Sequence, residues 1–334
     1  MNNKITINDI AKYANVSKTT VSFYLNGKFE KMSPDTRKKI EKVIKETNYK
    51  PSVIARCLNS KKMKIIGVLI GNITNSFANQ LVKGIDDYVR DKQYQLIVGS
   101  SSYNFDKEKE YIQRMISSGV DGFIVQPSMH FDKLINLIKS EKKEIVFVDS
   151  YPSSNMEKWV RTNNYDVILN TFENLIQKNY DEYIMITANP DILSARKERV
   201  KGFYDALKLN NKECITLTVD DNINEFELKD LLDKNINTTK KTLIFVVNCF
   251  LLPKVYVALD EFKKYIPKKI NLIGFDNTEW SNLATPSITT IVQPAYEEGR
   301  HAARILIDSI ENINEEIPNQ ILPCYINWAD STKK

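Results

Sequence analysis

Several common signals of function are missing from this 334-residue sequence. Its four cysteines are scattered without a Cys-x-x-Cys pair, so they offer no zinc site or disulfide framework and suit a reducing compartment. It has two histidines and no His-Glu-x-x-His, phosphate-loop or Gly-x-Ser-x-Gly motif, so we predict no metal, no cofactor and no enzyme activity. No apolar run reaches the about eighteen residues of a membrane span, and the first residues are too polar for a signal peptide. We therefore expect a cytoplasmic protein with no membrane segment.

Charge is unevenly distributed along the chain. Residues 1–64 contain fifteen lysines and arginines and five acidic residues, a net charge of +10. The rest of the chain has 32 basic and 37 acidic residues, a net charge of −5. A charged run is usually just a solvated surface. A basic head on an acidic body, however, is typical of a nucleic-acid-binding module joined to a second domain.

The basic head carries the pattern of two short helices joined by a tight turn. Thr6 can cap the first helix, with Asp9 in its first turn. After a turn at 15–16, Ser17 can cap the second helix, which would bury Val21 four residues before Leu25. Its other face would carry the short polar side chains Lys18, Thr19, Thr20, Ser22 and Asn26. The pattern fits a helix-turn-helix whose second helix enters the major groove, and an ordinary helical hairpin is the alternative. The charge of the head favours DNA binding.

A third helix should complete this head. Ser33 is its expected cap and Pro34 occupies its first position, where a missing N–H has no cost. It should end before Pro51, because the residue before proline avoids helical geometry. The next residues, 52–60, could form a helix of about two turns, too short to be stable alone. We predict a DNA-binding domain at 1–50 and a hinge helix or linker at 51–61.

The remaining residues alternate apolar runs with amphipathic stretches, which predicts parallel sheets covered by helices. Expected strands are 65–70, 95–98, 122–126, 145–148, 183–187, 242–247 and 271–274, and expected helices include 79–90, 107–117, 166–178, 199–209 and 251–265. About 270 residues is long for one such sheet, so two doubly wound lobes are favoured. We place the N-lobe at about 62–161 plus 293–320, and the C-lobe at about 162–292 plus 321–334. The fold class is therefore an all-α head plus an α/β body.

Polar side chains fall where a cleft between two such lobes should be, because ligands bind at the carboxyl ends of parallel strands. An arginine with carboxylates and amides suits a small hydroxyl-rich ligand. The candidates are Asn72, Thr74, Phe77, Gln126, Asp149, Arg199, Asn248, Asp276 and Trp280. The alternative for each is a loop cap or turn residue, and for Trp280 a tryptophan in the core or at the lobe edge.

The chain resembles the lactose/galactose repressor (LacI/GalR) family of bacterial transcription regulators. The resemblance rests on 6–11 (Thr-Ile-Asn-Asp-Ile-Ala), 16–17, 20–22, 25–26, Ser33, 36–37, 48–49, Pro51 and 55–58, and continues at 66–68, 121–124, 274–276 and 289–294. It implies lobes similar to periplasmic sugar-binding proteins. It also implies effector contacts at Gln126, Asp149, Arg199, Asn248 and Asp276. Within the family, residues 18–27 and 126–127 resemble the ketodeoxygluconate regulators.

We therefore expect a homodimer that binds a palindromic operator and responds to a sugar or sugar acid. Lys18, Thr19, Ser22 and Phe23 should face the major groove. Further expected DNA contacts are Ile7, Ser17, Thr20, Asn26, Ser33, Thr36, Tyr49, Ser52, Ala55 and Leu58. By resemblance, Leu58 would wedge into the central base step through the minor groove.

The sequence departs from the family pattern at several places. Phe23 stands where many members have arginine, which favours a thymine-methyl contact over a guanine contact. Cys249 replaces a common aspartate, 76–78 replaces Pro-Phe-Phe, and 327–331 lacks Arg-x-Ser. These changes affect the expected ligand pocket more than the assignment of the protein class. The alternative function is a sugar-binding protein or sugar-processing enzyme with an incidental helical head, and the contrast between basic head and acidic body favours the regulator.

Overall fold

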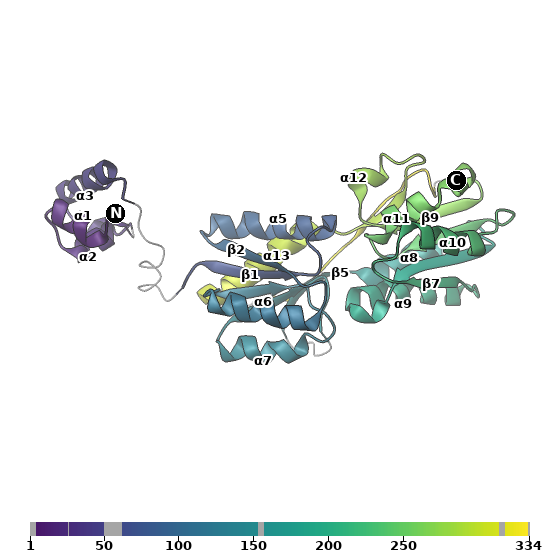
Figure 1. The fold of residues 1–334 in the computed structure, drawn as a ribbon, viewed down its shortest axis with the longest axis horizontal. Coiled ribbons are helices and arrows are strands. Elements are labelled where there is room, and N and C mark those ends of the chain that lie inside the picture. The colour runs from purple at the N-terminus through teal and green to yellow at the C-terminus, as the bar shows by residue number, and fades with distance from the viewer. Residues whose placement is uncertain (1–4, 26, 50–61, 153–156, 314–317, 333–334) are drawn as a thin grey trace. The chain divides into compact units, whose positions relative to one another are not determined.

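The computed structural model describes residues 5–25, 27–49, 62–152, 157–313 and 318–332. The chain divides into two compact units, residues 1–63 and 64–334 (Figure 1). The expected hinge helix, with Ser52, Ala55 and Leu58, and the expected contact Asn26 lie outside the described residues. Within the described ranges, no helix has the length and apolar character that would let it cross a membrane.

The head is a small three-helix unit. Its helices are α1 (Ile7–Tyr13), α2 (Lys18–Leu25) and α3 (Pro34–Thr47), with a 3₁₀ turn η1 (Phe29–Lys31) between the last two. Thr6 and Asp9 form the expected capping box at the start of α1. Ser33 Oγ accepts the N–H of Thr36 at 3.2 Å and caps α3 behind Pro34. The fully buried core of this unit consists of Ile10, Val21 and Ile40.

The first lobe of the body is a doubly wound parallel sheet in the order β11-β5-β4-β3-β1-β2. Helices α5 and α13 cover one face of the sheet, and α6 and α7 cover the other (Figure 1). Its elements are β1 (Ile65–Ile70), α5 (Ser76–Asp91), β2 (Gln95–Ser100), α6 (Phe105–Ser117), β3 (Gly122–Val125), α7 (Asp132–Ser140), β4 (Glu144–Val148), β5 (Lys158–Thr162), α13 (Ala295–Glu311) and β11 (Gln320–Leu322).

Two glycines let α5 and α13 approach backbone to backbone. A Cβ at Gly84 would lie 2.0 Å from the carbonyl oxygen of Tyr296, and a Cβ at Gly299 would lie 2.1 Å from that of Leu81. Both distances are far below van der Waals contact, so neither position accepts a side chain. The two helices therefore pack as one layer of the first lobe.

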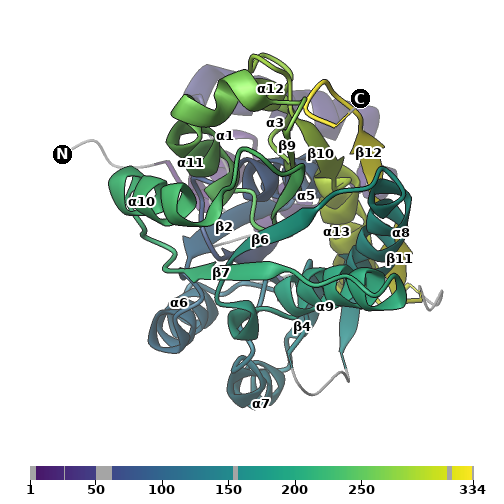
Figure 2. The ribbon, with the colours of Figure 1, turned by 90° about the vertical axis from the view of Figure 1, so that its right-hand side faces the viewer.

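The second lobe repeats this plan with the order β12-β10-β9-β8-β6-β7, in which only the edge pair β10–β12 is antiparallel. Helices α8 and α9 cover one face and α10 and α11 the other, as the end-on view in Figure 2 shows. Its elements are α8 (Asn164–Ile176), β6 (Glu182–Ala188), η2 (Pro190–Ile192), α9 (Ser194–Leu209), β7 (Ile215–Val219), α10 (Glu225–Asn235), β8 (Thr242–Val246), α11 (Leu251–Ala258), η3 (Asp260–Tyr265), β9 (Ile270–Phe275), α12 (Thr278–Ser281), β10 (Thr289–Val292) and β12 (Tyr325–Asn327).

The two sheets correspond strand by strand. Asp149 directly follows β4 and Asp276 directly follows β9, and both adopt left-handed backbone geometry, with φ of 60° and 53°. Gln126 Oε1 accepts the N–H of Gly71 at 3.0 Å after β3, and Asn248 Oδ1 accepts the N–H of Ala188 at 2.8 Å after β8. Each lobe thus places an amide and an aspartate at equivalent strand ends.

The chain passes between the lobes at three described places: β5 to α8, β10 to α13, and β11 to β12. Strand β11 extends to Leu322 and pairs in parallel with β5, so the first lobe runs two residues beyond the predicted boundary at 320. Helix α9 begins at Ser194, five residues before the predicted start at Arg199. The predicted helix 251–265 is divided into α11 and η3.

Candidate functional sites

The exposed surface of α2 carries most of the side chains predicted to reach base edges. Ser17 Oγ accepts the N–H of Thr20 at 3.1 Å, which fixes the first turn of the helix. Lys18 and Thr19 are exposed, and Ser22 and Phe23 are half-buried. The predicted contact residue Ile7 is half-buried and packs against the head core, as does Tyr49. The structure therefore gathers Lys18, Thr19, Ser22 and Phe23 on one helix.

Two basic side chains stack on aromatic rings on α2 and in the 3₁₀ turn that follows it. Lys31 Nζ lies 5.1 Å from the ring centre of Phe23, and the Arg37 guanidinium lies 3.9 Å from that of Phe29. Stacking on an aromatic ring positions a cation without neutralising its charge. The predicted DNA contacts Ser33 and Thr36 are hydrogen-bonded to each other at the start of α3.

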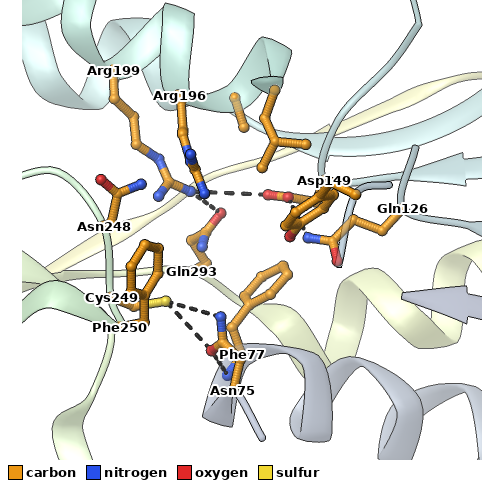
Figure 3. A pocket seen from close by; sticks show the side chains of 13 residues that line it. Asn75, Phe77, Gln126, Asp149, Arg196, Arg199, Asn248, Cys249, Phe250 and Gln293 are labelled. Atoms are coloured by element: carbon orange, nitrogen blue, oxygen red, sulfur yellow. Dashed lines mark hydrogen bonds and ion pairs between the residues drawn. The ribbon is translucent and has the colours of Figure 1, made fainter. Parts of the chain in front are cut away.

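A small cavity of about 40 Å³ lies between the strand ends of the two lobes (Figure 3). The N-lobe supplies side chains that follow β1 to β4, and the C-lobe supplies the start of α9 and the residues after β8 and β10. The lining residues are Asn75, Phe77, Tyr103, Gln126, Asp149, Leu193, Ala195, Arg196, Arg199, Asn248, Cys249, Phe250 and Gln293. Ligand pockets typically measure roughly 300–1,000 Å³, so the lobes here are closed on each other's side chains.

Asp149 is the central acid of the N-lobe side. Gln126 Nε2 donates to Asp149 Oδ2 at 2.7 Å, and the Asp149 N–H donates to Glu298 Oε1 of α13. Asp149 Oδ1 is buried and accepts no hydrogen bond from the described residues. This oxygen is therefore the natural acceptor for a donor that enters the cleft.

Arg199 is the central cationic side chain on the C-lobe side of the cavity, and it is only 6% exposed. Its Nε donates to Asn164 Oδ1 at 2.7 Å, and one terminal nitrogen donates to Gln293 Oε1 at 2.9 Å. Its guanidinium lies 3.7 Å from the ring centre of Phe275, the last residue of β9. The side chain is held from several sides, so its position is set before any ligand enters.

Direct contacts join the two lobes across the cavity. Arg199 lies 3.9 Å from Asp149 Oδ1. Asn75 Nδ2 donates to the sulfur of Cys249 at 3.1 Å, as Figure 3 shows. Beside the cavity, the N–H of Tyr151 donates to Ser194 Oγ at 2.8 Å. These contacts link the side chains that line the cavity to the spacing of the two lobes.

Burial controls the protonation of the acids around Arg199. It raises the pKa of Asp276 to about 6, and it also raises the pKa of Asp149, although the Arg199 charge opposes the shift in both cases. Glu298 is completely buried, and its pKa lies well above the usual range. Burial likewise raises the pKa of the Cys249 thiol to about 11. Burial therefore favours the protonated forms of these three acids more than solvent exposure would.

Five of the nine predicted ligand residues line the cavity: Phe77, Gln126, Asp149, Arg199 and Asn248. Asn72 and Thr74 do not; they are exposed, and Asn72 Oδ1 accepts the N–H of Thr74 at 2.9 Å in a turn. In the structure both are turn residues outside the cavity lining, and their contact with an effector stays a prediction.

The other two predicted residues lie behind the cavity lining. Asp276 is buried and accepts two hydrogen bonds from Gln293, at 2.9 and 2.8 Å, so it orients the glutamine that contacts Arg199. The Trp280 ring packs 5.7 Å from the Tyr256 ring against the second-lobe core, which selects the core alternative.

The structure adds lining residues that the sequence prediction omits. Arg196 precedes Arg199 by nearly one turn of α9, and its guanidinium approaches Asp221 at 3.4 Å. Helix α9 has no side-chain cap, because its N-cap residue is Leu193, whose side chain cannot accept a hydrogen bond, so no local signal marked its early start. Asn75 caps α5 through the Phe77 N–H at 3.0 Å, a recognisable pattern that could have identified it.

Chemically, the cleft offers two guanidinium groups, amides and a partly unpaired carboxylate. A ligand hydroxyl can donate its proton to Asp149, and its oxygen can accept from the arginine and amide N–H groups. The aromatic side chains of Phe77, Phe250 and Tyr103 supply apolar walls. The arrangement fits reversible recognition of a small, polar, ring-sized molecule by two converging lobes.

Comparison with known proteins identifies two family matches. Residues 6–52 match bacterial regulatory proteins of the lacI family. Residues 66–313 match a periplasmic binding protein domain. The boundary between the two matches falls in the same region as the boundary between the two compact units.

Relatives and a solved structure match over nearly the whole chain. A probable regulator, EndR of Paenibacillus polymyxa, is 30% identical over 93% of this chain and 92% of its own. The regulator KdgR of Bacillus subtilis is 28% identical over 92% of this chain and 91% of its own, which supports the resemblance to ketodeoxygluconate regulators. A lac repressor dimer bound to operator and the anti-inducer ONPF superimposes with a TM-score of 0.85 at 21% identity, covering 98% of this chain and 99% of that chain.

Proposed function

This chain belongs to the lacI family of bacterial regulatory proteins, and from that membership we propose that it represses carbohydrate-utilisation genes in response to a small effector. The observation that carries the proposal is the pairing of two features in one chain. One is a basic helix-turn-helix head with an exposed, capped α2. The other is a two-lobed body whose cleft is bridged by Arg199 and Asp149.

We propose that two copies bind one palindromic operator. One α2 addresses one half-site, so a symmetric protein should prefer a symmetric site. Thr19→Ala should change base preference, because Thr19 is exposed on the groove-facing side of α2. Lys38→Ala is the matched control, since an exposed lysine of α3 should at most weaken binding to all sequences equally.

Selection of binding sites from random DNA tests this part of the proposal. We expect a two-fold symmetric motif for the parent protein, and a motif altered at one position per half-site for Thr19→Ala. A motif without two-fold symmetry contradicts the dimeric operator. An unchanged motif for Thr19→Ala contradicts the assignment of α2 as the reading helix.

We propose that the effector is a sugar or sugar acid that occupies the cleft between Arg199 and Asp149. Hydroxyl groups suit Asp149 Oδ1, which accepts no hydrogen bond from the described residues, and a carboxylate would suit the two arginines. A ligand switches operator affinity only by preferring one lobe arrangement. Because Arg199 and Asp149 lie on different lobes, any ligand that contacts both favours one lobe spacing. A thermal-shift screen of sugars, sugar acids and sugar phosphates, followed by operator titration with each hit, identifies the effector and the sign of its effect.

The proposal excludes catalysis and places the protein in the cytoplasm with the DNA. It is supported by the regulatory role of the relatives named above. A purely sugar-binding protein or a sugar-processing enzyme is the alternative. Turnover of any ligand found in the screen, or failure of the full chain to retain selected DNA, favours that alternative.

A further inference from the structure

A second concave site lies on the C-lobe, away from the cleft cavity. It is a groove of about 370 Å³ between α8 and the edge strand β12. It shares no residue with the cleft cavity. Its lining consists of Asn163, Val167, Asn170, Thr171, Asn174, Cys324, Tyr325, Ile326 and Trp328. Its volume falls within the range of small-molecule pockets, roughly 300–1,000 Å³.

The groove has two kinds of wall, and none of the described side chains that line it is charged at neutral pH. One wall presents the amides of α8, where Asn170 and Asn174 lie one turn apart. The other presents two aromatic rings that remain largely exposed, Tyr325 at 57% and Trp328 at 42%. Residues 318–329 contain no charged side chain, in a chain that is 27% charged. Edge strands are protected by charge, by proline or by shortness, and β12 is short, so the feature that needs an explanation is its exposed aromatic side chains.

We propose that this groove binds a neutral mono- or disaccharide. An asparagine amide combines a donor and an acceptor, which matches a pair of neighbouring hydroxyl groups. An exposed aromatic face stacks on the apolar C–H face of a sugar ring. The polar side chains are already oriented: Asn174 Nδ2 donates to the Asn170 carbonyl at 2.8 Å, and Asn163 Oδ1 accepts the N–H of Cys324 at 2.8 Å. An extended peptide fits less well, because β12 spans only Tyr325–Asn327 and offers little edge for pairing.

The groove also lies at the hinge between the lobes. Asn163 follows β5 and Cys324 precedes β12, so the groove includes residues from two of the passages between the lobes. The neighbours of Asn163 connect to the cleft: Asn164 accepts from Arg199 at 2.7 Å, and Thr162 donates to Gln293 at 3.1 Å. A change in lobe spacing therefore changes the groove. A sugar bound there biases lobe closure, and this second step rests on the proposed cleft-based switch.

Calorimetric titration with glucose, galactose, maltose and cellobiose tests the site. We expect saturable binding of at least one sugar to the parent chain and to Arg199→Ala, whose cleft site is disabled. Trp328→Ser and Asn170→Ala should weaken that binding by about tenfold. Leu209→Ser, which alters another exposed apolar side chain, should leave it unchanged. Binding that persists in both groove variants, or that disappears only in Arg199→Ala, overturns the proposal, as does the absence of any saturable binding.

Hydrogen–deuterium exchange on the parent chain provides a readout that does not depend on variant folding. With saturating sugar we expect slower exchange at 324–328, and also at 247–250 in the cleft if the hinge transmits the effect. Protection at 324–328 alone supports the groove and overturns the coupling. Protection confined to the cleft overturns the groove. Neither outcome involves DNA, so failure here is distinguishable from failure of the proposed regulatory function.

Discussion

Removal of the Arg199 side chain is the sharpest test of the cleft. Arg199→Ala deletes the hydrogen bonds to Asn164 and Gln293 and the ion pair with Asp149. All three partners are almost completely buried, so water does not readily replace the lost donors. The variant should therefore lose the effector response and part of the stability of the body.

The magnitude follows from the burial of the partners. Breaking a buried ion pair by removing one member typically costs about 3–5 kcal/mol, because the other charge stays buried. At about 2–4 °C per kcal/mol for a domain of this size class, the melting temperature of the body should fall by roughly 10 °C. Operator binding should persist, because the head forms its own compact unit.

Arg196→Ala is the matched control, since Arg196 lies on the same helix and also lines the cavity. Its ion-pair partner, the Asp221 side chain, is 41% exposed and can be solvated after the change. Differential scanning calorimetry should therefore show a much smaller loss for Arg196→Ala. Equal losses for the two variants, or a loss below about 1 kcal/mol for Arg199→Ala, refute the assignment of Arg199 as the central buried cation. Tight binding of the natural effector to Arg199→Ala refutes its role in the cleft.

Three further predictions address burial, packing and capping. Because burial raises the pKa of Asp276 from 3.8 to about 6, the folded state binds more protons than the unfolded chain between pH 4 and 6, and stability falls as pH rises through that window. In urea unfolding, the free energy of unfolding of Asp276→Asn should decrease by about 3 kcal/mol less across this pH window than that of the parent. An equal decrease in the two proteins contradicts the raised pKa. In urea unfolding, Gly299→Ala should destabilise the body by about 3 kcal/mol, because the new Cβ would meet the Leu81 carbonyl oxygen. Helix propensity alone would instead predict a stabilisation of about 1 kcal/mol. Ser33→Ala should cost the head about 1 kcal/mol by circular dichroism melting, and Ser33→Asp should restore most of it by accepting the Thr36 N–H again.

Much of the fold can be predicted from the sequence, because its periodicity is strong. The wholly apolar run 65–70 predicts β1 with its observed bounds. The capping residues Thr6, Ser17 and Ser33 predict the starts of the three head helices, since each accepts a local N–H. The fold class, an all-α head with two doubly wound lobes, is confirmed.

The site is less predictable, because its geometry depends on contacts between distant residues. Asn72 and Asn75 are both polar residues after β1, and only the position of α5 decides which of them reaches the cleft. Asp276 follows a strand as expected, yet Gln293 covers it. The start of α9 escapes prediction because Leu193 occupies its N-cap position and cannot cap a helix through its side chain.

The matching strand orders give each lobe an aspartate at an equivalent strand end, yet the two carboxylates have different surroundings. Asp149 Oδ1 accepts no hydrogen bond from the described residues, whereas both oxygens of Asp276 accept from Gln293. The repeated backbone plan therefore leaves one strand-end carboxylate open to the cleft and commits the other to holding Gln293.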